Sequence, residues 1–286
     1  VRVIISTRNT LAGVIKAEVK TFTDLWAYRQ ALISFVVRNL TVRYKRSLLG
    51  FVWSFINPLL MVITYLIVFK YIFPRGEENY SVKLFCTLLA WRFFNATVMD
   101  GSATISKRLA LIKRVSFPRI ILPTASLISN FIDYLLSLTI LVIVFLAVRV
   151  TVNWPYLALA ISALMLQMLF AFGLSLILAS LSVFFDDIQF LVGSLFQMWF
   201  FLSPVLYPAV WVTDRDLPQI YKTIFFSNPM APLLMAYRSI VPNEEPTTIL
   251  PEYYTFLGIS AVVAIVTFSV GLFVFKRYES TFAKQV

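Results

Sequence analysis

Long apolar stretches alternate with short polar or basic segments along almost the whole chain of 286 residues. An α-helix rises 1.5 Å per residue, so about 20 apolar residues are enough to cross the hydrocarbon core of a bilayer. The second of these stretches is the least regular, because Arg92 and Asp100 interrupt it. We predict six membrane-spanning helices, at about residues 48–73, 84–105, 120–148, 156–182, 188–208 and 255–276.

The segment before the first predicted span has the pattern of an amphipathic helix. Between residues 25 and 46, polar side chains recur every three or four positions, at Gln30, Ser34, Arg38, Thr41 and Lys45. Such a helix is too charged to span a bilayer and too apolar for water, so we predict an interface helix on the cytoplasmic membrane surface. An ordinary water-exposed amphipathic helix is the alternative interpretation.

Two apolar stretches between the fifth and sixth predicted spans are too short to cross a membrane. Residues 221–226 and 230–241 lie within the region 214–245 and are predicted to be re-entrant helices that enter the membrane from one side. The fold class is therefore an all-α integral membrane protein. Its predicted parts are a tail and interface helix in residues 1–47, a six-helix transmembrane domain in residues 48–276 and a second tail in residues 277–286.

The distribution of basic residues predicts how the chain is oriented. Of its 25 Lys and Arg residues, 17 fall in residues 1–50, 107–119 and 276–286, which six spans place on one side of the membrane. The positive-inside rule assigns this side to the cytoplasm. We therefore expect a multi-pass protein with both termini in the cytoplasm.

The composition agrees with a membrane protein and excludes several kinds of chemistry. Hydrophobic residues make up 59% of the chain and charged residues only 14%, against about 25% charged in soluble domains. There is no histidine and only one cysteine, which excludes histidine-based triads, the usual zinc sites and intrachain disulfides. The net charge of +11 reports topology here rather than a nucleic-acid partner, and we expect no metal site.

Four local motifs, in order, give the chain a specific resemblance. They are Arg43-Tyr44-Lys45-Arg46-Ser47-Leu48-Leu49-Gly50-Phe51-Val52-Trp53 with Asn57-Pro58, then Leu111-Ile112-Lys113-Arg114-Val115-Ser116-Phe117-Pro118-Arg119, then Ser203-Pro204-Val205-Leu206-Tyr207, and finally Asn228-Pro229-Met230 with Tyr237-Arg238. With them, residues 25–280 resemble the permease subunits of ABC exporters for bacterial cell-surface polysaccharides.

The resemblance implies a homodimer in the bacterial inner membrane that binds two separate ATP-binding cassette subunits. It implies export of a lipid-linked polysaccharide, with O-antigen favoured over capsule or teichoic acid chains. The chain contains no Gly-x-x-x-x-Gly-Lys-[Ser/Thr] motif that could cradle ATP phosphates. We therefore expect no enzymatic activity and no cofactor in this chain, and expect ATP and Mg on the partner subunit.

The basic segment between the second and third predicted spans is the candidate for coupling to the ATP-binding subunit. Phe117 and Pro118 offer a rigid apolar tip for a cleft on a partner, and the basic residues suit an acidic rim around it. The alternative is that the charges only hold the loop in the cytoplasm, near anionic lipid. The candidate coupling residues are Lys107, Arg108, Lys113, Arg114, Val115, Ser116, Phe117, Pro118 and Arg119.

Basic residues also gather where the interface helix meets the first predicted span. They could hold the phosphate or pyrophosphate head of a lipid, or form a plain collar of side chains reaching the membrane boundary. The candidate head-group residues are Arg38, Arg43, Tyr44, Lys45 and Arg46.

Aromatic residues make up 16% of the chain, and many lie away from the ends of the predicted spans. Sugar rings present apolar C–H faces to aromatic rings, so an aromatic conduit would let a glycan slide through without deep binding minima. Ordinary packing is the alternative for each single residue. The candidate channel residues are Phe51, Phe55, Tyr65, Phe190, Phe196, Trp199, Phe200 and Tyr207.

Arg92, Asp100 and Asp133 fall inside predicted spans, where an unpaired charge costs at least about 2.5–3.5 kcal/mol on insertion scales. We predict that they pair with one another or face a wet cavity, with Arg92 and Asp133 as one candidate pair. Two further functions stay open: export of a small lipophilic molecule by an ABC exporter on the same scaffold, and proton-coupled transport. A membrane glycosyltransferase has only Asp186-Asp187 as a candidate acidic cluster.

Overall fold

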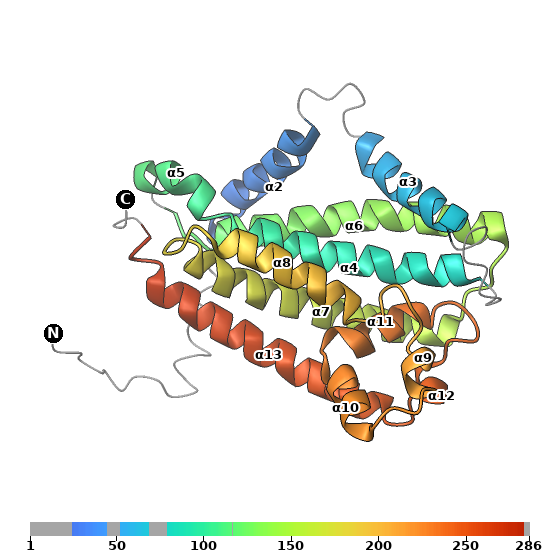
Figure 1. The fold of residues 1–286 in the computed structure, drawn as a ribbon. Helices are drawn as coiled ribbons and strands as arrows, with labels where there is room; N and C mark the ends of the chain where they lie inside the picture. The colour runs from blue at the N-terminus through green and yellow to red at the C-terminus, as the bar shows by residue number, and fades with distance from the viewer. Residues whose placement is uncertain (1–24, 45–51, 69–78, 116, 283–286) are drawn as a thin grey trace.

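The computed structural model describes residues 25–44, 52–68, 79–115 and 117–282, and all regular structure in these ranges is helical (Figure 1). The α-helices are α2 (Arg29–Tyr44), α3 (Trp53–Ile67), α4 (Tyr80–Ser102), α5 (Leu109–Arg114), α6 (Ile121–Val148), α7 (Trp154–Leu181), α8 (Ile188–Phe201), α9 (Val210–Thr213), α10 (Gln219–Ser227), α11 (Met230–Arg238), α12 (Pro246–Ile249) and α13 (Tyr253–Tyr278). A short 3-10 helix, η3 (Ser106–Arg108), precedes α5.

Four of these helices are long and apolar enough to cross a membrane: α4, α6, α7 and α13. They correspond to the predicted spans at 84–105, 120–148, 156–182 and 255–276. The predicted spans at 48–73 and 188–208 correspond to the shorter α3 and α8, and residues 48–51 and 69–73 lie outside the described part of the chain. Helix α8 ends at Phe201, because Pro204 and Pro208 lack the N–H groups needed to continue it.

Helix α4 lies at the centre of the bundle, in contact with α6, α7, α8 and α11. Its residues Leu84 to Ala90 are all buried, as expected for a stretch that is apolar on every side apart from Thr87. The region predicted to be re-entrant forms α10 and α11. Every residue of α11 is buried, so this helix belongs to the core, whereas α10 exposes Ile220, Tyr221 and Ile224.

The segments that carry the predicted cytoplasmic charges gather at one end of the bundle. In Figure 1, α5, the α7–α8 connection and the end of α13 lie at the left, and residues 202–252 with α9 to α12 lie at the right. Helix α2 lies against α6 beside the first of these ends. We call the left end the coupling end and the right end the α10 end.

Helices α7 and α13 approach each other so closely that backbone meets backbone. A Cβ atom added at Gly271 would lie 2.4 Å from the carbonyl oxygen of Gly173, and one added at Gly173 would lie 2.6 Å from the backbone of Phe268. Small residues at such crossings allow dense packing, which drives helix association where lipid replaces water. The crossing therefore requires glycine on both helices.

We expect Gly271→Ala to lower the melting temperature of the detergent-solubilised protein, because overpacking costs about 1–3 kcal/mol and the backbone has little freedom to move away. The control is Gly258→Ala in the same helix, where an added Cβ meets nothing within 4 Å. Alanine is the better helix former by up to about 1 kcal/mol, so this control should be neutral or stabilising. Equal melting temperatures for both variants, measured by a thermal-shift assay, would contradict this account of the crossing.

Candidate functional site

The coupling segment and α2 form one packed unit at the coupling end. The Arg108 guanidinium donates a hydrogen bond from Nη2 to Asn39 Oδ1 at 2.6 Å and lies over the Phe35 ring, 5.6 Å from its centroid. The Phe35 ring also packs against Phe117, with 5.6 Å between centroids. Burial, and secondarily the charge of Arg38, lower the pKa of Arg108 below its usual value.

The expectation that Phe117 is an exposed apolar tip is wrong. Its side chain is only 9% exposed and belongs to an apolar cluster with Ile112, Ile120 and Phe275, because the chain itself covers this ring. Pro118 and Arg119 are partly buried, and the Arg119 N–H donates to Glu279 Oε1 at 2.8 Å. The exposed candidate coupling residues are Lys107, Lys113, Arg114 and Val115, whereas Ser116 lies outside the described residues.

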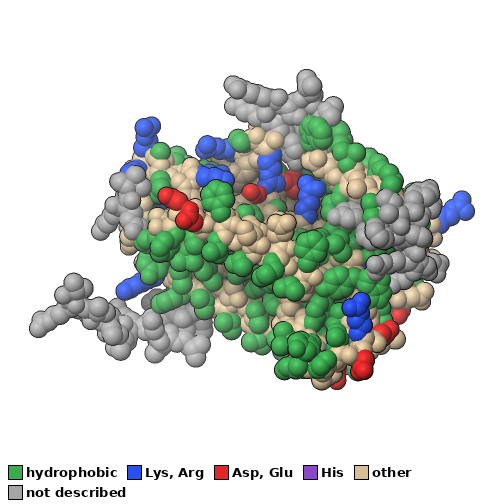
Figure 2. Space-filling view, in the orientation of Figure 1, with side chains coloured by type: hydrophobic (Ala, Val, Ile, Leu, Met, Phe, Trp, Pro, Cys, Tyr) green, Lys and Arg blue, Asp and Glu red, His purple; other side chains and the backbone are tan. Residues whose placement is uncertain are grey.

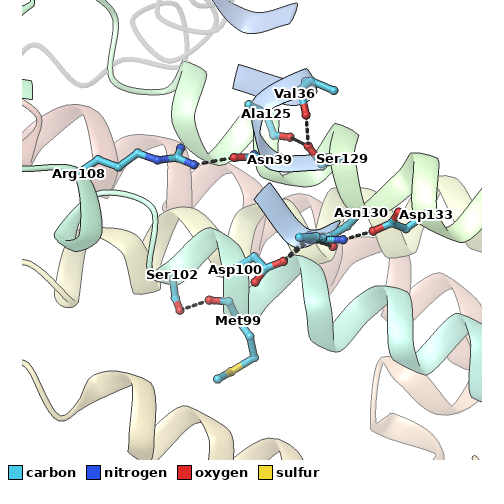
Figure 3. A network of polar contacts seen from close by, with 11 residues as sticks. Val36, Asn39, Met99, Asp100, Ser102, Arg108, Ala125, Ser129, Asn130 and Asp133 are labelled. Carbon is cyan, nitrogen blue, oxygen red and sulfur yellow. Dashed lines mark hydrogen bonds and ion pairs between the residues drawn. The ribbon is translucent and has the colours of Figure 1, made fainter. Parts of the chain in front are cut away.

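Arg43, near the end of α2, is the centre of a charged network between helices. Its guanidinium forms an ion pair with Asp133 through Nη1. Through Nη2 it contacts Asp100 Oδ2 and Asn130 Oδ1, each at 2.5 Å. Asn130 also donates to Asp100 at 3.2 Å. Figure 3 shows Asp100 on α4 and Asn130 and Asp133 on α6 converging beneath α2.

The network changes the interpretation of two groups of predicted residues. Arg43, one of the candidate head-group residues, pairs with the two acids of the spans. Asp100 and Asp133 are therefore in ion pairs, and the cation that the structure records against both comes from α2. Arg92 lines a cavity that Arg43, Asp100 and Asp133 also line. Arg38 is exposed, and the Tyr44 side chain, Lys45 and Arg46 lie outside the described residues.

Two cavities adjoin this network and share Arg43 and Asp100. The first, of about 350 Å³, lies between α3, α4 and α6; its charged and amide residues are Arg43, Arg92, Asp100, Asp133, Asn57 and Asn130, and we call it the balanced cavity. The second, of about 280 Å³, is lined by four basic side chains and one acid, namely Arg38, Arg43, Lys107, Arg108 and Asp100, and we call it the basic cavity. Figure 2 shows acidic and basic side chains side by side where the surface is hollowed near the top of the molecule.

The predicted channel aromatics do not share one surface. Phe196 is buried against Phe94 and Trp91, and Trp199 and Phe200 are partly buried against the same Trp91 ring, with centroids 5.3–6.2 Å apart. Phe190 is 80% exposed. Phe55 and Tyr207 are partly buried, and Phe51 and the Tyr65 side chain lie outside the described residues. Within the single chain, Phe196 is therefore a packing residue rather than a residue that lines a conduit, because it is buried against Trp91 and Phe94.

The proline motifs of the α10 end meet at Asn228. Its side-chain amide donates to Ser203 Oγ at 2.8 Å, and its oxygen accepts hydrogen bonds from Trp199 Nε1 at 2.9 Å and the Met230 N–H at 3.1 Å. Nearby, Tyr237 donates to Gln167 Oε1 at 2.6 Å. Asn228 thus links the chain break at Pro204 to the one at Pro229, and Tyr237 attaches α11 to α7.

A buried charge cluster at the α10 end was missed from the sequence. Glu244 Oε1 lies 3.3 Å from both Lys83 Nζ and Arg238 Nε, and the side chains of the three residues are 2–6% exposed. Arg238 also lies over the Tyr80 ring, 5.6 Å from its centroid. The sequence offered two signals, Arg238 in the Tyr237-Arg238 motif and Lys83 at the very start of an apolar stretch, but their shared partner Glu244 lies 161 positions from Lys83.

A bundle with four helices long and apolar enough to cross a membrane is the architecture of a multi-pass membrane protein, and comparison with known proteins gives its class. The family model described as ABC-2 type transporter matches residues 30–241. The chain belongs to this family.

Named relatives extend over nearly the whole chain. The O-antigen export system permease protein RfbA of Myxococcus xanthus is 31% identical over 94% of this chain and 100% of its own length. An RfbA protein of Klebsiella pneumoniae is 27% identical over 88% of this chain and 93% of its own length. The capsule polysaccharide export inner-membrane protein CtrC of Neisseria meningitidis serogroup B is 25% identical over 69% of this chain and 78% of its own length.

We expect Glu244→Gln to destabilise the protein strongly, since it leaves Lys83 and Arg238 buried without their shared carboxylate. Breaking a buried ion pair in this way costs about 3–5 kcal/mol. The adjacent Glu245→Gln is the matched control, because Glu245 is less buried. Denaturant or thermal unfolding in detergent should show a clearly lower stability for Glu244→Gln than for Glu245→Gln. Similar stabilities would show that the charge cluster does not stabilise the fold.

We expect Arg43→Gln to loosen α2 from the bundle, because Asp100 and Asp133 then lose the cation that lies between them. Limited proteolysis followed by mass spectrometry should detect faster cleavage within residues 25–52. Arg38→Gln, on the exposed side of the same helix, is the control and should be cleaved at the wild-type rate. Identical protection in both variants would mean that other contacts hold α2.

Proposed function

We propose that this chain is the membrane permease of an ATP-driven exporter that moves a lipid-linked surface polysaccharide, O-antigen foremost, across the bacterial inner membrane. The observation that carries the proposal is the match of 94% of the chain to a relative named as an O-antigen export permease. The capsule export protein among the relatives supports the same class of substrate. The chain supplies the path, and a separate ATP-binding subunit supplies the energy.

The coupling end has the features of a docking surface for that subunit. Lys107, Lys113 and Arg114 present basic side chains beside the exposed apolar Val115. Exposed basic residues attract an acidic partner surface and fix its orientation, whereas the apolar side chain contributes to the buried part of an interface. Residues on this surface would bind the ATP-binding subunit in the cytoplasm, where both termini also lie.

Contacts between the coupling segment and α2 provide a route for force. Arg108 and Phe117 both pack on Phe35 of α2, so a push on the segment moves α2 with it. Arg43 then links α2 to α4 and α6 through Asp100 and Asp133. Closure of the ATP-binding subunits would in this way shift α2 as an interface helix and strain its attachment to the spans.

Exposed apolar rows on α3 and α8 support assembly as a homodimer of six-span subunits. Phe190, Leu191, Leu195, Met198 and Phe201 occupy one exposed side of α8, and Leu59, Leu60 and Ile63 lie exposed on α3. Apolar surface of this kind faces lipid or a second copy of the chain. We assign it to the dimer, in which separation of α3 and α8 opens the conduit and α10, packed on the buried α11, frames its outer end.

The basic cavity supports binding of the lipid head group. Arg38, Arg43, Lys107 and Arg108 bring four positive side chains from α2 and η3 around a single acid, Asp100. Phosphate groups bind where several guanidinium and ammonium groups converge, because each N–H donates a charge-assisted hydrogen bond. A phosphate or pyrophosphate between polyprenol and glycan fits this charge, next to the membrane lipid that surrounds α2.

Charge reversal at the coupling end tests the transport proposal. In cells that lack the native permease and produce the ATP-binding subunit, we expect Lys113→Glu and Arg114→Glu to reduce surface polysaccharide at least tenfold. Co-purification of the ATP-binding subunit should fall in parallel, since repulsion replaces attraction at the interface.

Arg215→Glu is the control, because Arg215 is an exposed basic residue near the α10 end. It should leave partner binding and export at the wild-type level. Normal export by both coupling-end variants would remove the docking role. Failure of the wild-type permease to restore any surface polysaccharide would overturn the proposed function itself.

A further inference from the structure

The balanced cavity lies between polar faces of two otherwise apolar helices. On α4, Leu89, Arg92, Phe93, Ala96 and Asp100 recur at helical spacing along one side. On α6, Asn130, Asp133, Tyr134 and Ser137 do the same, although the span has a mean hydropathy of 2.6 in its most apolar window. Polar residues at such positions are expensive inside a membrane and mark a ligand or ion pathway.

The charges of this cavity select against an ionic ligand. Its lining carries two guanidinium groups, Arg43 and Arg92, and two carboxylates, Asp100 and Asp133, so neither sign is in excess. The neighbouring basic cavity differs sharply, with four cations and one acid. No group of three or more possible metal ligands occurs within the described ranges. The balanced cavity therefore suits a ligand that is polar and neutral.

Its hydrogen-bonding groups and rings match a sugar. Carboxylate, amide and guanidinium groups are planar, and each can bind two adjacent hydroxyl groups. A sugar hydroxyl can both donate and accept a hydrogen bond, so it can pair with any of these three groups. Asp133 Oδ1 is buried and accepts no hydrogen bond, so one acceptor is left unsatisfied. Phe93 and Tyr134 pack together with 5.2 Å between ring centroids and line the cavity; they are only 3% and 6% exposed, so they offer a small aromatic contact to the C–H groups of a pyranose ring.

The balanced cavity lies beside the basic cavity, and this position limits which sugar of the substrate it can bind. The two cavities share Arg43 and Asp100, so a ligand that fills both must place a phosphate next to a neutral polar group. A glycan joined to its lipid through phosphate has this arrangement at its first sugar. The balanced cavity has a volume of about 350 Å³, which is at the small end of the range for ligand pockets. It can therefore hold a single small group but not a polymer.

We propose that the balanced cavity is a saccharide subsite, which binds the first neutral sugar of the lipid-linked chain while the basic cavity binds the adjacent phosphate. This inference rests on the proposed function and deepens it. It assigns recognition of the start of the glycan to α4 and α6, separately from passage of the rest of the polymer.

The test compares two probes on the purified complex of permease and ATP-binding subunit in lipid nanodiscs. One probe is polyprenyl diphosphate, and the other is polyprenyl diphosphate that carries one neutral hexose. Dissociation constants are measured by native mass spectrometry. The wild-type complex should bind the sugar-bearing lipid at least tenfold more tightly than the sugar-free lipid, because only the former fills both cavities.

Ala96→Leu fills the balanced cavity without removing a charge, and Asn57→Ala removes one of its amides. Both variants should weaken binding of the sugar-bearing lipid about tenfold and leave the sugar-free lipid within twofold of wild type. Ala261→Leu is the matched control, since Ala261 is also a partly buried alanine in a span but lies outside the cavity. It should change neither constant.

Each other outcome has a separate meaning. Equal wild-type affinity for the two probes, or an equal loss of both in Ala96→Leu and Asn57→Ala, overturns the saccharide subsite while the export function stands. Absence of binding by either probe to the wild-type complex contradicts the lipid-linked substrate, and with it the proposed function.

Discussion

A charged side chain inside a membrane must find an opposite charge or water, and this constraint determines where α2 lies. Asp100 and Asp133 sit on two different helices of the bundle, and both would be costly there without a cation. Arg43 reaches them from a helix that lies outside the bundle. The pairing attaches α2 to α4 and α6, and it leaves the remaining polar groups of those helices around two cavities.

Side-chain contacts also connect the coupling end to α2. Arg108 is held by Asn39 and the Phe35 ring, and Phe117 packs on the other side of that ring. A loop without contacts to α2 could move without moving the membrane helices. Here the aromatic contact and the Arg43 network link the exposed basic residues to the spans through α2.

Close backbone packing and buried polar contacts hold the rest of the bundle. Gly173 and Gly271 bring α7 and α13 together, while Asn228 fixes the chain where Pro204 and Pro229 interrupt its helices. At the α10 end, Lys83 and Arg238 share Glu244 away from water. These contacts hold the rest of the bundle together, whereas the two cavities lie beside α2 and α3.

The sequence by itself determined the all-helical class, the four long apolar helices α4, α6, α7 and α13 with their approximate ends, and the family, because apolar length, helical spacing and short motifs are local properties. It also indicated that Asp100 and Asp133 need a partner. Only the tertiary structure decided that this partner is Arg43, 57 and 90 positions away, that Phe117 is buried, and that Phe196 packs inside the chain. The physical reason is that the free energy of a buried charge or ring depends on which distant segment covers it, and helical periodicity carries no information about that choice.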